Sequence, residues 1–200
     1  MESPKHSASS NTSITSLANR LVDLSGSLDL HLRERGHEPL NFSCDSAPLL
    51  ETPQWEKLRD QLNNTAHDLL QLVNGPKNDL RRWTWSIIDL SAMEMALSCR
   101  LFEHIPNDTV GWAAAEVARA VQADEGFIQR ILRMQATNRI FEEHTDGKFR
   151  HTASSNFLRT SISSAMCDVA LDDCSKAASN MNIWMGALSR SAEPEVSPFM

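Results

Sequence analysis

Closely spaced glycines are missing from this sequence of 200 residues. Its seven glycines are spread along the chain, and the nearest two, Gly26 and Gly36, stand ten residues apart. Loops that cradle a phosphate or a nucleotide cofactor need glycines at short spacing, because only then can the backbone approach the ligand. No GxGxxG pattern or P-loop can be built here. An alternating series of strands and helices, which a doubly wound nucleotide-binding domain requires, is missing as well.

The usual signatures of metal and nucleophile chemistry are also missing. Neither HExxH nor GxSxG occurs. No CxxC pair occurs among the four cysteines, which are Cys44, Cys99, Cys167 and Cys174. We therefore predict no catalytic residue and no metal site, and free thiols rather than disulfides. His144 and His151 fall on opposite arms of a predicted hairpin and could approach each other, although a structural role is the simpler interpretation.

Long apolar runs are not present. No stretch approaches the roughly 20 continuous apolar residues that a membrane helix needs. Residues 1–13, "MESPKHSASSNTS", lack the apolar segment of a secretory signal. We therefore expect a soluble, cytoplasmic protein whose first 13 residues form a disordered tail.

What the sequence does contain is helical spacing of apolar residues. One stripe predicts a helix over residues 14–35, and it consists of Ile14, Leu17, Leu21, Leu24 and Leu28. A second amphipathic helix is predicted over 55–73, ended by Gly75 and Pro76. Residues 79–104 are predicted to form one long helix that is apolar over most of its circumference and therefore central.

The next segment has the outline of a winged helix. It consists of a short helix at 113–121, a turn at 122–123, a second helix at 124–138 and a β-hairpin at 140–152 around Asp146-Gly147. The predicted core side of the second helix is made of Phe127, Ile128, Ile131, Leu132 and Met134. The predicted fold class is thus mainly α, a winged-helix domain with extra N- and C-terminal helices.

Winged helices often bind DNA, and charge tests that interpretation. The chain carries a net charge of -7, whereas nucleic-acid binders usually present a basic surface. Across 111–152 the basic residues are Arg119, Arg130, Arg133, Arg139, Lys148 and Arg150, and the acidic residues are Glu116, Asp124, Glu125, Glu142, Glu143 and Asp146. These charges cancel, and Asp124-Glu125 stand at the helix end that usually meets the bases. We expect no nucleic-acid partner, and DNA binding is the weaker alternative.

Four segments together resemble one protein family. They are "LFEHIP" (101–106), "EVARAVQADEGFIQRILR" (116–133), "TNRIFEE" (137–143) and "FRHTASSNFL" (149–158). The family is that of the S-adenosylmethionine-dependent small-molecule O-methyltransferases of the caffeate and flavonoid type. The fungal sterigmatocystin and aflatoxin O-methyltransferases are the most similar branch. One local departure is the short helix at 113, where Ala113 replaces the Ser of a Ser-x-x-Glu capping box that ends at Glu116.

The resemblance implies a domain plan. Residues 14–75 would be N-terminal amphipathic helices, 78–192 a winged-helix dimerisation domain, and 193–200 a linker truncated before the catalytic domain. The family's dimerisation module exchanges helices with a second subunit, so a homodimer, or a heterodimer with a full-length methyltransferase, is implied. S-adenosylmethionine would bind only if a missing Rossmann-like catalytic domain were supplied.

The resemblance also places a small aromatic or polyketide substrate near the segment after the hairpin. The residues concerned are Met166, Met181, Trp184 and Met185, which line a substrate pocket in one interpretation and a core or dimer seam in the other. Three hypotheses for the function follow. The chain is a truncated O-methyltransferase of secondary metabolism that is inactive alone, a standalone accessory partner of a biosynthetic enzyme, or a winged-helix DNA-binding protein.

Overall fold

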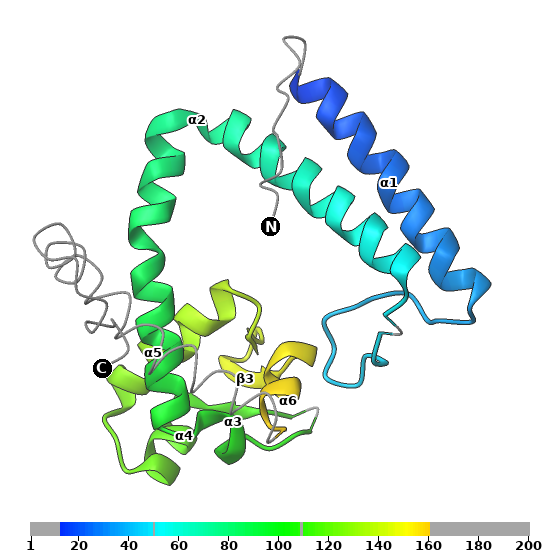
Figure 1. Ribbon diagram of the computed structural model, residues 1–200. Coiled ribbons are helices and arrows are strands. Elements are labelled where there is room, and N and C mark those ends of the chain that lie inside the picture. Colours follow the sequence, from blue (N-terminus) through cyan, green and yellow to red (C-terminus); the bar gives the residue numbers. More distant parts are fainter. Residues whose placement is uncertain (1–12, 50, 109, 161–200) are drawn as a thin grey trace, which may run out of the picture. The chain divides into compact units, whose positions relative to one another are not determined.

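The computed structural model describes residues 13–49, 51–108 and 110–160 (Figure 1). In these ranges the chain is mainly helical, with one small sheet. Its elements are α1 (Ile14–Glu34), α2 (Pro53–Ser98), α3 (Leu101–His104), β1 (Trp112–Ala113), α4 (Ala114–Val121), α5 (Glu125–Thr137), β2 (Phe141–Glu143), β3 (Lys148–His151) and α6 (Ala153–Leu158). The chain divides into an N-terminal unit (Met1–Asn41 and Ser46–Ser86) and a C-terminal unit (Phe42–Asp45 and Ile87–Met200).

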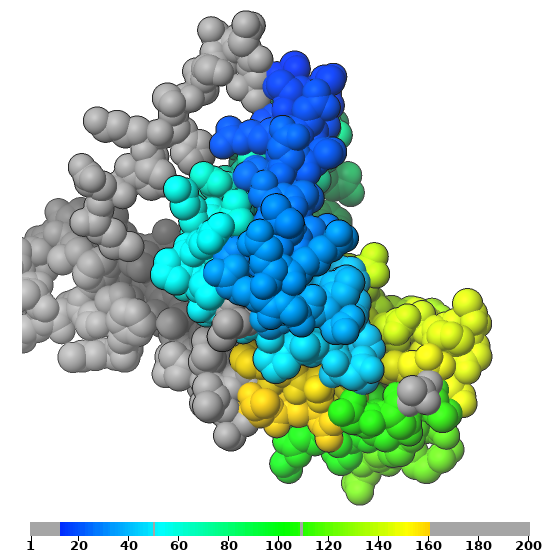
Figure 2. All heavy atoms as spheres, turned by 90° about the vertical axis from the view of Figure 1, so that its right-hand side faces the viewer, coloured from blue at the N-terminus to red at the C-terminus, as the bar shows by residue number. Residues whose placement is uncertain are grey.

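The N-terminal unit is a pair of helices around a small apolar core. Helix α1 begins where the side chain of Ser13 accepts a hydrogen bond from the backbone of Ser16, which satisfies an otherwise free N–H group. Its core consists of Leu28, Leu32 and Trp55, with Leu58 and Leu62 packed beside them. Figure 2 shows the blue atoms of α1 lying against the cyan atoms of the first part of α2. The predicted amphipathic helix at the N-terminus is confirmed.

Helix α2 has the predicted break at Gly75 and a second, unpredicted end at Ser98. No loop separates the segments around Gly75; instead Gly75 alone leaves the helical conformation, at φ 65°, and Pro76 starts the next turn. A proline is tolerated there because the first N–H groups of a helix have no partner. The predicted helix 79–104 is interrupted: α2 ends at Ser98, and Arg100 adopts a left-handed conformation before α3.

The core of the C-terminal unit lies between the short helices and the sheet. Its fully buried members include Leu101, Ile105, Val117, Ile128, Leu132, Phe141 and Phe149. Helix α4 ends at Gln122, which takes a left-handed conformation, and α5 starts where the carboxylate of Asp124 accepts a hydrogen bond from the N–H group of Phe127. Both helices were predicted to within one residue. Gln135, also buried, was not predicted as part of the core.

The sheet has the order β1-β3-β2, and all its pairs are antiparallel. The predicted hairpin is β2–β3, with Phe141 opposite His151 and a turn in which Gly147 has φ 76°. Strand β1 was not predicted, because two residues, Trp112 and Ala113, are too few to show alternation.

A short strap from the N-terminal loop completes the C-terminal unit. Ser43 forms an isolated bridge with Thr152. The N–H group of Ala153 donates to the carbonyl of Phe42, and the guanidinium of Arg139 lies 5.0 Å from the centroid of the Phe42 ring. The Asn156 side chain donates to the carbonyl of Cys44 at 3.0 Å. These contacts give a loop segment that is distant in sequence a defined place beside α6.

Candidate functional site

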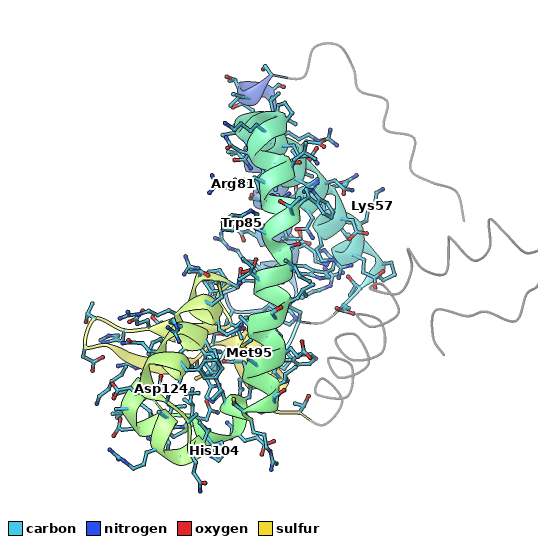
Figure 3. All side chains as sticks on the ribbon, turned by 90° about the vertical axis from the view of Figure 1, so that its left-hand side faces the viewer. Lys57, Arg81, Trp85, Met95, His104 and Asp124 are labelled. Carbon is cyan, nitrogen blue, oxygen red and sulfur yellow. The ribbon has the colours of Figure 1, made fainter. Side chains whose placement is uncertain are left out.

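The surface of α2 is the most unusual feature among the described residues. Every residue from 81 to 90 is exposed, although the segment reads "RRWTWSIIDL". The exposed large apolar side chains on this part of α2 are Leu80, Trp83, Trp85, Ile87, Ile88, Leu90 and Met95. Figure 3 shows Arg81, Trp85 and Met95 along the helix. Contiguous exposed apolar surface of this kind marks an interaction site.

Part of this apolar surface forms a regular stripe. Leu80 and Trp83 in the N-terminal unit stand three residues apart, as do Ile87 and Leu90 in the C-terminal unit, so each pair lies on one side of its part of the helix. Ala92 and Ala96, which are buried at 8% and 0% exposure, lie on the opposite side by the same periodicity. Leu80, Trp83 and Ile87 are 65%, 61% and 58% exposed. Fully burying such a side chain contributes about 1.5–3 kcal/mol, so the stripe can stabilise a complex.

Polar contacts around the stripe leave its apolar side chains uncovered. The guanidinium of Arg81 lies 5.2 Å from the centroid of the Trp85 ring, which is a cation–π arrangement. The Asn138 side chain donates to the carboxylate of Asp89 at 3.0 Å. By periodicity Arg81 and Asp89 lie on the sides of α2 away from the stripe, so these contacts do not cover it.

The surface that would meet DNA offers little positive charge. The carboxylate of Asp124 caps the start of α5, and Glu125 occupies its first turn. Arg133 is engaged with Glu143, with its Nε and one terminal nitrogen each 3.0 Å from Oε1. A groove of about 810 Å³ lies nearby in the C-terminal unit. Its charged lining is balanced, with Arg133, Arg139 and Arg150 against Asp108, Glu142 and Glu143.

The two histidines of the hairpin do not approach each other, contrary to one of the two sequence interpretations. The strand register places His151 opposite Phe141, whereas the N–H group of His144 donates to the carbonyl of Lys148 nearer the turn. His144 contacts Asp146 at 3.2 Å instead. The structural role that we considered simpler is the one these contacts support.

His151 is a buried structural residue. Its Nε2 lies 2.9 Å from the carbonyl of Ile105, and its Nδ1 lies 2.9 Å from the hydroxyl of Ser155. A carbonyl only accepts, so Nε2 carries the proton and Nδ1 accepts from Ser155. Burial lowers the pKa of His151, and the positive charge of Arg159 lowers it further, while the hydrogen bond to Ile105 opposes both. The neutral imidazole of His151 therefore links the end of α3 to α6 through two hydrogen bonds.

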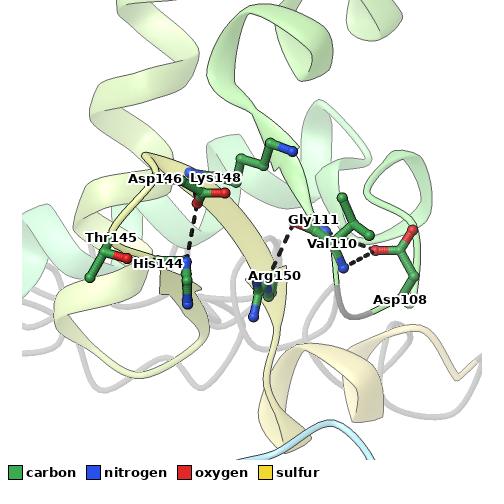
Figure 4. A network of polar contacts seen from close by, with 8 residues as sticks. All are labelled: Asp108, Val110, Gly111, His144, Thr145, Asp146, Lys148 and Arg150. Carbon is green, nitrogen blue, oxygen red and sulfur yellow. Dashed lines mark hydrogen bonds and ion pairs between the residues drawn. The ribbon is translucent and has the colours of Figure 1, made fainter.

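A small polar network lies just before β1 (Figure 4). One carboxylate oxygen of Asp108 accepts from the N–H groups of Val110 and Gly111, at 2.9 and 2.8 Å. Gly111 has φ +70°, and a Cβ atom there would lie 2.5 Å from the carbonyl oxygen of Phe149. Only glycine allows this close approach of the two backbones.

The described glycines do not come together in one loop. The space that a side chain would take at Gly111 is filled by the chain's own strand, and Gly36, Gly75 and Gly147 stand in separate turns. Over the described ranges, no group of three metal-ligating side chains comes together. None of the described helices is long and apolar enough to cross a membrane.

The predicted substrate or seam residues, Met166, Met181, Trp184 and Met185, lie outside the described residues. At the start of α4, one half of the expected capping box is present: Glu116 accepts from the N–H group of Ala113 at 2.8 Å.

The sequence had already shown that residues 79–104 are apolar over most of the circumference of the predicted helix. What it could not show is that residues 81–90 have no cover from the described chain.

Comparisons with known proteins agree with the resemblance seen in the sequence. Residues 85–161 match the model of the O-methyltransferase dimerisation domain. The chain is 32% identical to the O-methyltransferase sol2 of Alternaria solani over 188 residues, which cover 94% of this chain and 44% of that protein. It is 26% identical to the O-methyltransferase AMT9 of Alternaria alternata, covering 97% of this chain and 47% of the relative. The chain thus spans about half the length of these relatives.

Solved structures show the same fold at low sequence identity. OxaC matches with a TM-score of 0.71 and 14% identity, over 93% of this chain and 42% of that one. LepI in complex with SAM matches with a TM-score of 0.66 and 14% identity, over 91% and 42% of the two chains. At this identity the likeness concerns the fold alone.

Proposed function

Residues 85–161 belong to the O-methyltransferase dimerisation-domain family, and we propose that the exposed apolar face of α2 is where the chain pairs with a second subunit. The observation that carries the proposal is the group of exposed apolar residues Ile87, Ile88 and Leu90 on the part of α2 that belongs to the C-terminal unit. Large apolar side chains grouped on one surface are stabilised by neighbours that exclude water. Within the described residues those neighbours are missing, and a second subunit supplies them.

The wider role proposed for the protein is methyl transfer in fungal secondary metabolism, to a small aromatic or polyketide substrate. Its support is the similarity to the Alternaria O-methyltransferases. The 200 residues themselves contribute subunit association rather than methyl transfer, because their glycines stand too far apart for a cofactor loop. S-adenosylmethionine would be held by a separate catalytic domain.

The arrangement of α4, α5 and the three-stranded sheet supports a winged helix used as a scaffold. Helix α5 buries Ile128, Ile131 and Leu132 in the core, and acidic Asp124 and Glu125 stand at its start. In this proposal the helix-turn-helix packs the C-terminal unit and positions α2, and it reads no DNA.

Self-association is tested by light scattering and sedimentation velocity on the 200-residue chain from about 0.1 to 50 µM. We expect a dimer, and we expect Ile87→Glu to shift it toward the monomer, because a carboxylate in an apolar seam is costly to desolvate. Val110→Glu is the matched control, since Val110 is 56% exposed and Ile87 is 58% exposed. A wild-type monomer over the whole range would overturn the proposal.

The accessory-partner alternative uses the same face of α2 but a different occupant. Co-expression with a full-length relative such as sol2 would then yield a heterodimer in preference to the homodimer. Calorimetry with S-adenosylmethionine tests whether this chain binds the cofactor without a separate catalytic domain. We expect no heat of binding to this chain alone. Micromolar binding would show that these 200 residues hold a cofactor site after all.

A further inference from the structure

Strand β2 lies at the edge of its sheet, and no strand of the described chain pairs with its outer side. The sheet order β1-β3-β2 leaves that side open. An unpaired strand edge presents N–H and carbonyl groups to which another extended chain can bond. The groove of about 810 Å³ in the C-terminal unit reaches this edge, because Phe141, Glu142 and Glu143 all line it. Ala136 and Thr137, at the end of α5, line the same groove, so there is space beside β2 for one more strand.

The strand register shows which backbone groups of β2 point outward. The N–H group of His144 donates to the carbonyl of Lys148 at 2.8 Å, so this pair beside the turn is hydrogen-bonded. Bonded and non-bonded pairs alternate along an antiparallel ladder, and the next residue of β2 is Glu143. Glu143 and Phe141 therefore occupy non-bonded positions, and their N–H and carbonyl groups face away from β3. Outside the sheet, no described residue bonds to these groups.

Arg139 presents its charge to the same groove. Its guanidinium lies over the ring of Phe42, and among the described residues it has no ion-pair partner. Arg139 follows the end of α5 with φ 60°, a conformation that favours glycine. An arginine held in an unfavourable conformation at the rim of a groove points to a role for its side chain. Phe42 is 62% exposed, so its ring offers an apolar contact beside the charge.

The other charges of the groove are largely engaged with one another. Glu143 is paired with an arginine of α5, and Asp108 accepts from two backbone N–H groups of its own turn. The register sets Glu142 opposite Arg150 on the neighbouring strand. Arg139 is therefore the cation that remains for an incoming ligand, although the formal charges of the groove balance.

We propose that an extended acidic segment of another protein adds to the outer edge of β2 as a fourth strand. The backbone of this segment bonds to the outward groups of Phe141 and Glu143, and one of its carboxylates meets the guanidinium of Arg139. Successive side chains of a strand point to opposite faces, so acidic residues alternate with β-branched or other apolar ones. This surface is separate from the face of α2 proposed for subunit pairing and does not depend on it.

Selection from a random peptide library supplies the probe. Ten-residue peptides displayed on phage are selected on the immobilised 200-residue chain, and we expect enriched sequences in which Glu or Asp alternates with β-branched residues. One enriched peptide is then synthesised, and fluorescence polarisation gives its Kd. No enrichment over a bare surface, or enriched peptides without acidic residues, would overturn the proposal.

Arg139→Gly tests the charge without adding strain, because glycine suits a φ of 60°. The variant should bind the peptide about two- to fivefold more weakly than the wild type, and raised salt should reduce the difference. Arg119→Ala is the matched control, an equal charge change at an exposed position outside the groove, and it should leave the Kd unchanged. A peptide that binds Arg139→Gly as tightly as the wild type would overturn the assignment of an acidic segment.

Glu143→Pro tests the strand edge, because proline lacks the N–H group to which the added strand bonds, and an edge strand tolerates it. The peptide should bind this variant about three- to tenfold more weakly. Glu143→Gln removes the same carboxylate but keeps the N–H group, so it should bind at least as tightly as the wild type. Strand addition is wrong if the two variants, both folded by circular dichroism, bind alike.

Amide hydrogen exchange of the wild type tests the strand edge without any substitution. The bound peptide should slow exchange at Phe141 and Glu143, and unchanged exchange at both would contradict strand addition. Ile87→Glu separates this proposal from subunit pairing through α2, because it should leave the Kd of the peptide unchanged. Loss of peptide binding in Ile87→Glu would place the peptide on α2 and overturn the proposal.

Discussion

Helix α5 and residues 81–90 of α2 are both rich in apolar side chains, but they meet their surroundings in different ways. Helix α5 buries Ile128, Ile131 and Leu132 and exposes the polar side. On α2, Trp83 and Ile87 stand 61% and 58% exposed. An amphipathic helix can bury its apolar side within one chain, whereas the exposed apolar side chains of residues 81–90 lack such neighbours among the described residues. We propose that this difference separates residues that stabilise the fold from residues that stabilise an assembly.

The largest expected difference is between two truncations. Phe149→Ala should reduce the free energy of unfolding by about 3–5 kcal/mol, because Phe149 is fully buried and its removal leaves a cavity. Ile87→Ala should change monomer stability by less than about 0.5 kcal/mol. Urea unfolding followed by circular dichroism, at concentrations below the dimer Kd, measures both values. Equal losses would mean that Ile87 is part of the fold of a single chain.

A glycine substitution tests how closely β1 and β3 approach. Gly111→Ala should cost roughly 2–4 kcal/mol, because a methyl group would clash with the Phe149 carbonyl in addition to the strain of a positive φ. Gly147→Ala should cost only about 1 kcal/mol, since Gly147 has φ +76° but open space around it. Thermal unfolding of the two variants gives the comparison. If the two losses were the same, strain alone would account for both.

Lowering the pH should weaken the core while leaving the α2 stripe unaffected, because the stripe carries no titrating group in that range. The pKa of His151 is lowered in the folded chain, so the folded state takes up its proton less readily than the unfolded state. The contribution of His151 to the free energy of unfolding is fully present above about pH 6.5, which is the pKa of a histidine in the unfolded chain. This contribution is lost as the pH falls below that value.

The scale of this effect follows from thermodynamics, because a pKa difference of one unit between the folded and unfolded chain corresponds to about 1.4 kcal/mol. His151→Gln keeps a donor for the carbonyl of Ile105 but does not titrate, so its unfolding free energy should vary less between pH 7 and 5. A wild-type protein with the same pH dependence as this variant would speak against the assignment.

The smallest expected effect concerns Gln135 in the core beside α5. Its side chain is 1% exposed, and neither amide atom has a hydrogen-bond partner in the described structure. Gln135→Met, which keeps the length of the side chain, should therefore be neutral or stabilise the fold by up to about 1–2 kcal/mol. A clear loss in urea unfolding would reveal a polar partner for this amide.

Much of the local structure follows from features that neighbouring residues share. Helix α5 starts beside Asp124, Gly75 breaks α2, and Asp146-Gly147 turn the hairpin, all as predicted. Each of these three features depends on the side chain or the φ angle of a residue that acts only on neighbours within about four positions. The missed features have no such local cause. Arg100 adopts a left-handed conformation, for which arginine is not a typical residue. Gln135 is buried although it is polar.

Residue order along the chain is enough for most of the helices, the hairpin, the balanced charge of residues 111–152 and the apolar character of α2, because periodicity, capping and charge are short-range properties. Tertiary contacts alone decide which apolar faces are covered. They bury His151 between Ile105 and Ser155, place the strap at Ser43 beside Thr152, and leave Leu80 to Leu90 exposed. The physical reason is that burial depends on which distant segments come together, and neither spacing nor composition records that.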